Sequence, residues 1–245
     1  MKTLGIVGGI GPESTIEYYR LLIDAYQKRM GAKTMPQMVI NSIDVYRGLA
    51  MLDDNRPDLL ADYIADAVKT LANAGADFAV IAANTPHLVF PEVQSRSSLP
   101  LLSIVEAACA EAKRQGITRM VLLGTRFTMQ ARFYPDVFTR EGITLVAPNE
   151  AELLYIHDKY INELLKGVVL PETRDGLLRI IARMKDEDRI EAVLMAGTEL
   201  VLIIKDEKVL GLPVLDTAKI HVEAAINRLL EAELPEGTAW IAPIR

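Results

Sequence analysis

Short apolar runs alternate with longer amphipathic segments along the whole of this 245-residue chain. Apolar runs of this length are typical of parallel strands that are buried on both faces. They predict strands at residues 3–7, 38–41, 78–82, 101–104, 120–123, 144–146, 192–195 and 214–215. Between them, apolar residues at helical spacing predict helices at residues 13–29, 57–74, 105–115, 127–140, 150–166, 174–185 and 219–231. This alternation predicts an α/β fold with mostly parallel sheets.

The chain also repeats its own pattern. Residues 79–85 (AVIAANT) and residues 192–198 (AVLMAGT) are both apolar strands that run into small residues and a threonine. Two interpretations stay open. The repeat reflects only the similarity of all buried parallel strands, or the chain has two similar α/β halves. In the second case the carboxyl ends of the strands would face one cleft, where ligands bind in such sheets.

Composition narrows the class of protein. Half of the residues are hydrophobic, 24% are charged, and the net charge is -6 with no basic block. Nucleic acid and acidic membrane surfaces are therefore not expected as partners. The apolar stretch before Gly8 is too short for a signal peptide, and no apolar run is long enough to span a membrane. The lone cysteine, Cys109, excludes an intramolecular disulfide, so we expect a soluble, cytoplasmic protein.

Candidate chemistry begins after the first predicted strand, at residues 8–15 (GGIGPEST). The segment matches neither GxGxxG nor a P-loop, so a dinucleotide is not expected. Its glycines allow close backbone approach and the start of the next helix attracts a carboxylate, although a tight strand-to-helix turn explains the glycines equally well. Three His and one Cys exclude a Cys/His zinc site of the usual spacing, so we expect no metal.

Two further polar segments follow predicted strands. They are residues 84–87 (NTPH) and residues 197–199 (GTE), at equivalent places of the two predicted halves. Backbone N–H groups and threonine hydroxyls are the donors that bind an α-carboxylate, or the enediolate formed from one. The pair of segments therefore predicts a carboxylate site.

These segments resemble the aspartate/glutamate racemase family of cofactor-independent amino-acid racemases. The resemblance covers nearly the full length and rests on residues 8–15, 84–87, 124–129 (GTRFTM), 197–200 (GTEL) and 215–217 (LDT). It implies two Rossmann-like, three-layer halves related by pseudo-twofold symmetry, with the active site in the cleft between them. It also implies a small-molecule amino acid or carboxylate as ligand, no cofactor, and a homodimer. The implied domains are residues 1–104 together with 216–245, and residues 105–215.

The chemistry of this family uses two cysteines on opposite faces of the substrate. One thiolate removes the Cα proton, and the other thiol delivers a proton to the opposite face. In this sequence the two positions are Ala83, before Asn84, and Gly197, before Thr198. Neither side chain has a proton that it can transfer, so this chain cannot use the two-thiol mechanism. A laboratory replacement of cysteine would explain alanine at position 83 but not glycine at position 197.

Other residues are candidates for proton transfer. His87 could act as a base near neutral pH, or it could orient its loop. Glu199 could act as an acid or base, or it could bind backbone amides at the start of a helix. Cys109 lies in a helical pattern and is expected to be a small core residue, while His157 and His221 are expected at the surface or in packing.

The resemblance also implies which residues bind the substrate. Family members that take acidic substrates hold the distal carboxylate with basic side chains, and Arg47 and Lys166 lie in roughly the right segments. Arg126 and Met129 follow the fifth predicted strand and could also line the cleft. The predicted substrate-binding set is Gly9, Arg47, Asn84, Thr85, Thr125, Thr128, Lys166, Gly197 and Thr198.

Three functions stay open for this sequence. The first is an isomerase that moves a proton at the α-carbon with a non-thiol acid/base pair or a single base. The second is a lyase or decarboxylase, in which loss of carbon dioxide makes the carbanion and only a proton donor is needed. Arylmalonate decarboxylase, a relative, keeps the second of the two cysteines, which this chain lacks. The third is a binding protein that keeps the carboxylate site without catalysis.

Overall fold

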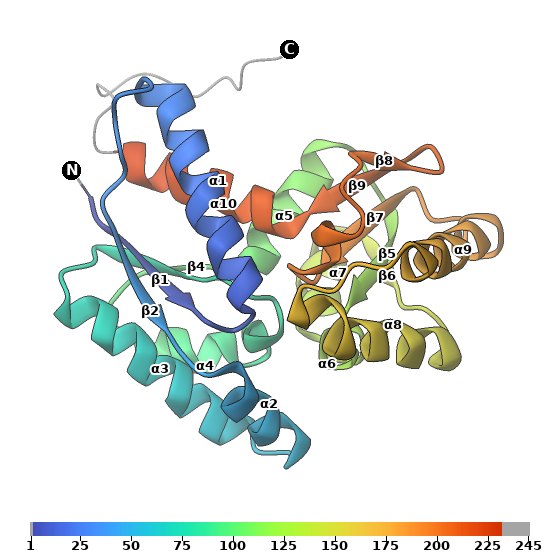
Figure 1. Cartoon of the computed structure of the whole chain (residues 1–245), viewed down its shortest axis with the longest axis horizontal. Coiled ribbons are helices and arrows are strands. Elements are labelled where there is room, and N and C mark those ends of the chain that lie inside the picture. Colours follow the sequence, from blue (N-terminus) through green and yellow to red (C-terminus); the bar gives the residue numbers. More distant parts are fainter. Residues whose placement is uncertain (1, 232–245) are drawn as a thin grey trace.

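The computed structural model describes residues 2–231, which form two α/β halves (Figure 1). The first sheet has the order β2-β1-β3-β4, and the second has the order β6-β5-β7-β9-β8. The first sheet contains β1 (Leu4–Gly8), β2 (Met38–Ser42), β3 (Phe78–Ile81) and β4 (Leu101–Leu102). The second contains β5 (Arg119–Gly124), β6 (Thr144–Val146), β7 (Ala192–Ala196), β8 (Lys208–Val209) and β9 (Leu212–Asp216). All pairs in these sheets are parallel except β8 with β9.

The two sheets share one strand order. In each half the first strand lies between the second and the third, and the fourth strand follows the third, as β2-β1-β3-β4 and β6-β5-β7-β9 show. The repeat seen in residues 79–85 and 192–198 corresponds to β3 and β7, the third strand of each half. The predicted α/β fold with two similar halves is therefore confirmed.

Helices cover both faces of each sheet. The first half carries α1 (Pro12–Met30), α2 (Val45–Asp53), α3 (Pro57–Asn73), the 3₁₀ helix η1 (Thr85–Val89) and α4 (Phe90–Arg96). The second carries α5 (Ile104–Arg114), α6 (Arg126–Gln130), α7 (Phe133–Arg140), α8 (Glu150–Asn162), η2 (Leu164–Lys166), α9 (Pro171–Glu187) and η3 (Leu200–Leu202). The last helix, α10 (Thr217–Leu230), packs against both α1 and α5 and so returns to the first half (Figure 1). No helix within residues 2–231 is long and apolar enough to cross a membrane.

Each sheet is buried between two apolar layers, which explains the unbroken apolar runs in the sequence. On β5, Met120 and Leu122 pack under α5 and α7, whereas Val121 and Leu123 pack under α8 and α9. All four side chains are at most 1% exposed. The three-layer arrangement of each half follows from this alternation.

The predicted helix at residues 127–140 is wrong, because the chain forms two helices there. Ala131, after α6, has an extended backbone, and α7 begins at Phe133. Pro135 explains the break, since inside a continuous helix it would lack its hydrogen bond and clash with the preceding turn. In the first turn of α7 the missing N–H costs nothing.

The sequence reading also missed α2. This helix begins at Asp44, whose side chain accepts hydrogen bonds from the backbone N–H groups of Tyr46 (2.8 Å) and Arg47 (3.4 Å). Val45, Leu49 and Leu52 lie at i, i+4 and i+7, which places them on one face. A cap followed by this spacing was the available signal.

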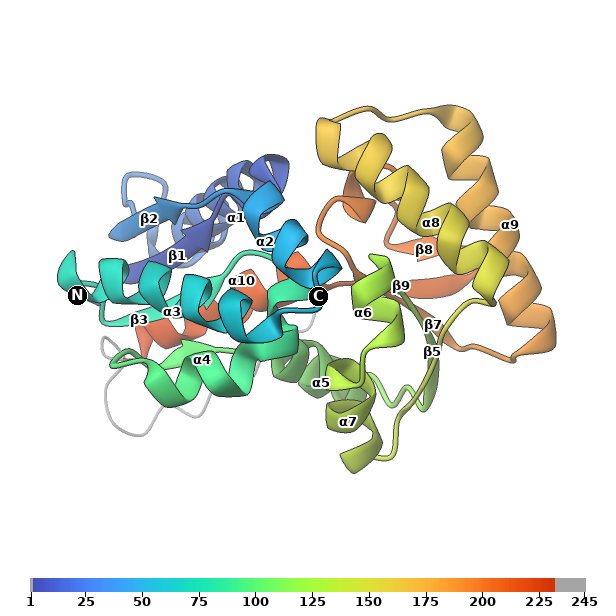
Figure 2. The same ribbon diagram turned by 90° about the horizontal axis from the view of Figure 1, so that it is seen from below.

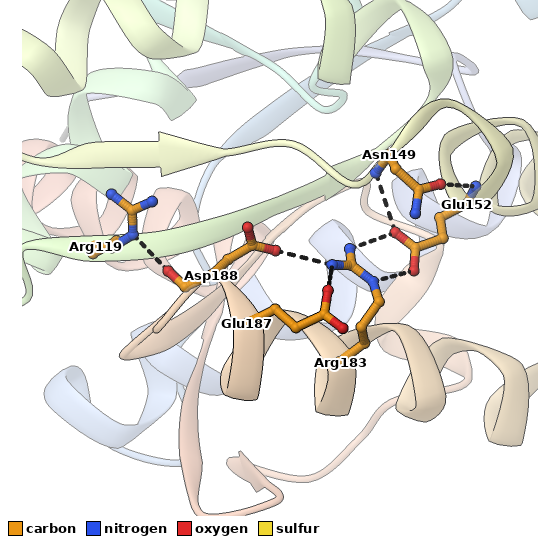
Figure 3. A network of polar contacts seen from close by, with 6 residues as sticks. All are labelled: Arg119, Asn149, Glu152, Arg183, Glu187 and Asp188. Atoms are coloured by element: carbon orange, nitrogen blue, oxygen red, sulfur yellow. Dashed lines mark hydrogen bonds and ion pairs between the residues drawn. The ribbon is translucent and has the colours of Figure 1, made fainter.

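A polar network connects α9 to the rest of the second half (Figure 3). Arg183 donates to both carboxylate oxygens of Glu152 at 2.6 Å and to Asp188 at 3.2 Å. Glu152 also completes a capping box with Asn149 at the start of α8. Arg119 of β5 donates to the backbone oxygen of Asp188 at 2.7 Å, so one cluster joins α8, α9 and β5.

The domain boundaries predicted at 104/105 and 215/216 stay predictions. Residues 232–245, which belong to the predicted first domain, lie outside the described residues.

His221 of α10 is a fully buried, neutral junction in the first half. The Tyr18 hydroxyl donates to its Nδ1 (2.9 Å), and its Nε2–H donates to the backbone oxygen of Leu102 (3.0 Å). Burial lowers the pKa of His221 from 6.5 to about 4, and burial next to His221 lowers the pKa of His87 to about 3. As the pH falls below 6.5, the unfolded chain therefore binds protons at these histidines that the folded chain does not bind.

We expect the free energy of unfolding that His221 contributes to be complete above pH 6.5 and to be lost as the pH falls toward about 4. The stability difference between the wild type and His221→Gln should therefore narrow over that window in urea unfolding followed by circular dichroism. Val222→Ala is a buried change on the same helix that removes no titrating group. It should lower the free energy of unfolding by the same amount at each pH. A parallel shift of both variants would contradict the prediction.

Candidate active site between the two halves

A pocket lies between the two halves, near the carboxyl ends of both sheets. Its polar side consists of Asn84, Thr85, Thr125, Tyr160, Thr198 and Glu199. Its apolar wall consists of Val45, Leu49, Leu52, Leu60, Ile161 and Leu165. In Figure 2, α2 of the first half and α6 of the second half face each other beside this region.

Three threonine hydroxyls join the two halves at the polar side. Thr85, just after β3, lies 3.0 Å from the Thr125 hydroxyl and 3.1 Å from the Thr128 hydroxyl. Thr125 and Thr128, which follow β5, lie 3.2 Å from each other. Each hydroxyl can both donate and accept, so this threonine triangle can turn its protons toward a ligand oxygen.

Asn84 is a buried junction rather than a free ligand-binding amide. Its Oδ1 accepts a hydrogen bond from the Tyr134 hydroxyl of α7 at 2.5 Å. Its Nδ2 donates to the Thr217 hydroxyl at 3.2 Å, and Thr217 donates to the backbone oxygen of Met195 at 2.7 Å. The side chain thus connects the end of β3 to α7, α10 and β7, while its edge lines the pocket.

Glu199 is a buried carboxyl group on the polar side of the pocket. It is 2% exposed, and it accepts hydrogen bonds from Ser14 (2.6 Å), Thr198 (3.0 Å) and Tyr160. Burial raises the pKa of Glu199, and the three hydroxyl donors oppose that shift. Since Ser14 belongs to α1, this carboxyl group also connects the two halves.

Gly11 brings the backbone directly onto this carboxyl group. Its φ is +105°, and a Cβ at this position would lie 1.9 Å from Oε1 of Glu199. The glycine in residues 8–15 that matters for the pocket is therefore Gly11, because only a residue without a side chain fits there. It lets the start of α1 approach Glu199, where the helix dipole favours a negative charge.

Tyr160 takes up the space beside Gly197. A Cβ built on Gly197 would lie 2.5 Å from Cε2 of the Tyr160 ring. Tyr160 lines the pocket, and its hydroxyl donates to Glu199. Burial, together with the neighbouring Glu199, raises the pKa of Tyr160 well above 10, so the phenol holds its proton at neutral pH.

Ala83, the other predicted position of a family cysteine, also lines the pocket. Its side chain is 4% exposed and ends in a methyl group. The two positions therefore differ, since a proton-bearing phenol lies beside Gly197 and a methyl group lies at Ala83.

The remaining candidate bases lie elsewhere. His87 is 2% exposed, donates from Nδ1 to the backbone oxygen of Ala83 (3.0 Å) and accepts at Nε2 from the Ile104 N–H (3.2 Å). With both ring nitrogens engaged, His87 orients its loop. Cys109 is 3% exposed under α7, and burial raises the pKa of its thiol.

Several predicted substrate-binding residues do not line the pocket, among them the fully buried Thr128. The N–H of Gly9 donates to the Thr15 hydroxyl (2.8 Å), and Gly197 lies behind Tyr160. Arg47 lies over the ring of Tyr63, 4.5 Å from its centroid, on a different groove. Lys166 is exposed at the end of η2.

Arg126 and Met129, the two residues after the fifth strand that could line the cleft, make contacts outside the pocket. Arg126 pairs with Asp53 at 3.4 Å, next to the lining residues Thr125 and Leu52. Met129 is packed in the core beneath α8.

A family comparison agrees with this arrangement. The model of the Asp/Glu/Hydantoin racemase family matches residues 7–225. This chain belongs to that family. Among individual members, the broad specificity amino-acid racemase RacX of Bacillus subtilis is 25% identical over 235 residues, which cover 93% of this chain and 98% of RacX. Membership in the family supports a racemase-like isomerase.

Solved structures of the family have the same two-domain fold. A Yersinia pestis protein assigned to the Asp/Glu racemases is 30% identical, with a TM-score of 0.85 over 94% of this chain and all of the other. An aspartate racemase homologue from Pyrococcus horikoshii is 33% identical, with a TM-score of 0.79 and the same coverage.

Three parts of this candidate site were not predicted from the sequence. Tyr160, Ser14 and the apolar face of α2 come from segments far from the strand ends on which the motifs lie. Tyr160 had a partial signal, because a glycine at position 197, where the resemblance predicts a cysteine, leaves room for another side chain. Nothing in the sequence identified which side chain fills it.

We expect Gly11→Ala to destabilise the protein more than Gly31→Ala. Both glycines have a φ of +105°, but an added Cβ at Gly31 meets nothing within 4 Å. The backbone cost of about 1–3 kcal/mol is common to both variants. Gly11→Ala must also move Glu199 away from its buried donors, which adds roughly 1–3 kcal/mol of overpacking. Urea unfolding measures both, and equal losses would contradict the close approach.

Proposed function

We propose that this protein binds an amino acid or a related carboxylate in the interdomain pocket and transfers a proton at its α-carbon without thiols. The observation that carries the proposal is the Tyr160–Glu199 pair beside Gly197, on the polar side of the pocket. Thr85 and Thr125, the two members of the threonine triangle that line the pocket, supply hydroxyl donors for the carboxylate and for the enediolate that forms from it.

The proton transfer uses only groups of this chain. The Tyr160 oxygen takes the Cα proton as its own proton moves to Glu199, and the electron pair of the broken C–H bond passes into the carboxylate as an enediolate. Burial raises the pKa of Glu199 toward neutral pH. A group whose pKa lies near the working pH can both take and return a proton. Reversal of the step returns the proton to the same face.

On the opposite face, the described lining residues include no equivalent group. Among the described lining residues, the one at the first family cysteine position is Ala83, whose methyl group cannot give a proton. Inversion then requires a proton from water on that face or a second binding orientation of the substrate. When the proton held by the Tyr160–Glu199 pair is replaced from water before it returns, the α-position exchanges without inversion. We therefore expect exchange of the α-proton with solvent to be faster than racemisation.

A decarboxylase is the second candidate, and the same asymmetry favours it. When carbon dioxide leaves, no base is needed, and one proton donor on one face completes the reaction. Incubation with 2-alkylmalonates and product analysis would distinguish it, because a decarboxylase yields the monoacid with one configuration in excess.

In deuterated water we expect a panel of amino acids to reveal α-deuteration of the recovered enantiomer at least about tenfold faster than appearance of its mirror image. Tyr160→Phe keeps the ring beside Gly197 and removes the hydroxyl, so exchange should fall by about 10²–10⁴-fold. Tyr155→Phe, on the same helix but outside the pocket lining, should leave exchange unchanged. Binding of amino acids without any exchange would instead indicate a carboxylate-binding protein.

Restoring the two thiols tests whether the scaffold supports racemisation. In Ala83→Cys with Gly197→Cys, the new side chain at 197 collides with the Tyr160 ring, so we expect a lowered melting temperature and little racemisation. Adding Tyr160→Ala removes the ring and should increase racemase activity. A fully stable and active double variant would show that Tyr160 does not restrict this position.

A further inference from the structure

The apolar wall has a regular origin in the sequence. Val45, Gly48, Leu49 and Leu52 lie at i, i+3, i+4 and i+7 of α2, so one face of this helix is turned to the pocket. Leu60 of α3 extends this surface from the first half. Ile161 and Leu165 complete it from the second half. A ligand held by the polar side therefore extends its side chain along a hydrocarbon surface.

Basic side chains near the wall are directed elsewhere. On α2, Arg47 lies two residues from Val45 and is not on the face that carries Val45 and Leu49. Its guanidinium stacks on Tyr63. Arg126 lies at the edge of the pocket, where it pairs with Asp53 and joins α6 to the end of α2. Within the described part of the pocket lining, no Lys, Arg or His is present.

A charged substrate side chain would therefore be poorly placed. A distal carboxylate would be removed from water without a cationic partner, in a pocket whose charged lining residue, among those described, is Glu199. A cationic or amide side chain would lie against Val45, Leu49 and Leu165, which offer no hydrogen-bond acceptor on their side chains. Hydrocarbon contact favours an aliphatic group at this place.

We propose that the substrate of this site carries an uncharged aliphatic side chain, and that the apolar wall selects it over acidic substrates. This inference rests on the proposed function for the position of the α-carboxylate. The wall is formed by α2 and α3 from one half and by α8 and η2 from the other. The Asp53–Arg126 pair, whose side chains are partly exposed, connects the end of α2 to the start of α6 beside this wall.

Calorimetry with both enantiomers of leucine, methionine, aspartate and glutamate tests the selection on the wild-type protein. Leucine against aspartate and methionine against glutamate compare side chains of similar length, with and without a charge. We expect the aliphatic member of each pair to bind at least about tenfold more tightly. Equal or tighter binding of aspartate or glutamate would overturn the inference.

Charge introduced into the wall should reverse the preference. Leu49→Arg should raise the affinity for aspartate or glutamate at least about tenfold and lower that for leucine, because the guanidinium supplies the missing partner. Leu52→Arg, at a half-buried position, is the second variant if Leu49→Arg does not fold. The control is Leu154→Arg, an exposed position of α8 that should leave both affinities unchanged. Unaltered binding in a folded wall variant would contradict the selection by this wall.

The outcome separates the substrate class from the proposed function. α-Deuteration of aspartate or glutamate, but not of leucine or methionine, would overturn the aliphatic class and leave the proton-transfer function standing. Failure of every amino acid to bind or exchange would overturn both.

Discussion

The buried carboxyl group of Glu199 is the constraint on which the pocket depends. A carboxyl group at 2% exposure is stable only when hydrogen-bond donors replace the water it has lost. Its donors come from Ser14 in the first half and from Thr198 and Tyr160 in the second. The two halves must therefore meet in one arrangement, and the glycine backbone at Gly11 permits that approach.

Other buried polar groups between the two halves are also hydrogen-bonded to partners in both halves. Asn84 connects β3 with Thr217 and Tyr134, and the threonine triangle connects the ends of β3 and β5. Since buried networks of this kind are costly when partly satisfied, they fix the relative position of the halves. The same residues form the polar side of the pocket, so the contacts that hold the halves together also build the site.

The two positions at which the family resemblance predicts cysteines have different surroundings. Next to Gly197, the ring of Tyr160 fills the space and brings a phenol into contact with Glu199. Ala83 leaves a methyl group on the pocket surface. The site is thus asymmetric in its proton-bearing groups, although the fold around it is built from two halves with one strand order.

The sequence by itself determined the α/β class, most strands, the repeated halves, the family and the presence of a single cysteine, because these follow from local periodicity, short motifs and composition. It also predicted Asn84, Thr85, Thr125, Thr198 and Glu199 as candidate site residues, and all five line the pocket, since strand ends of parallel sheets meet at one edge. Only the tertiary structure decided that His87 has both ring nitrogens engaged, that Arg47 stacks on Tyr63, and that Tyr160 lies beside Gly197. Those outcomes depend on helix faces and on contacts between residues far apart in the chain, which periodicity does not encode.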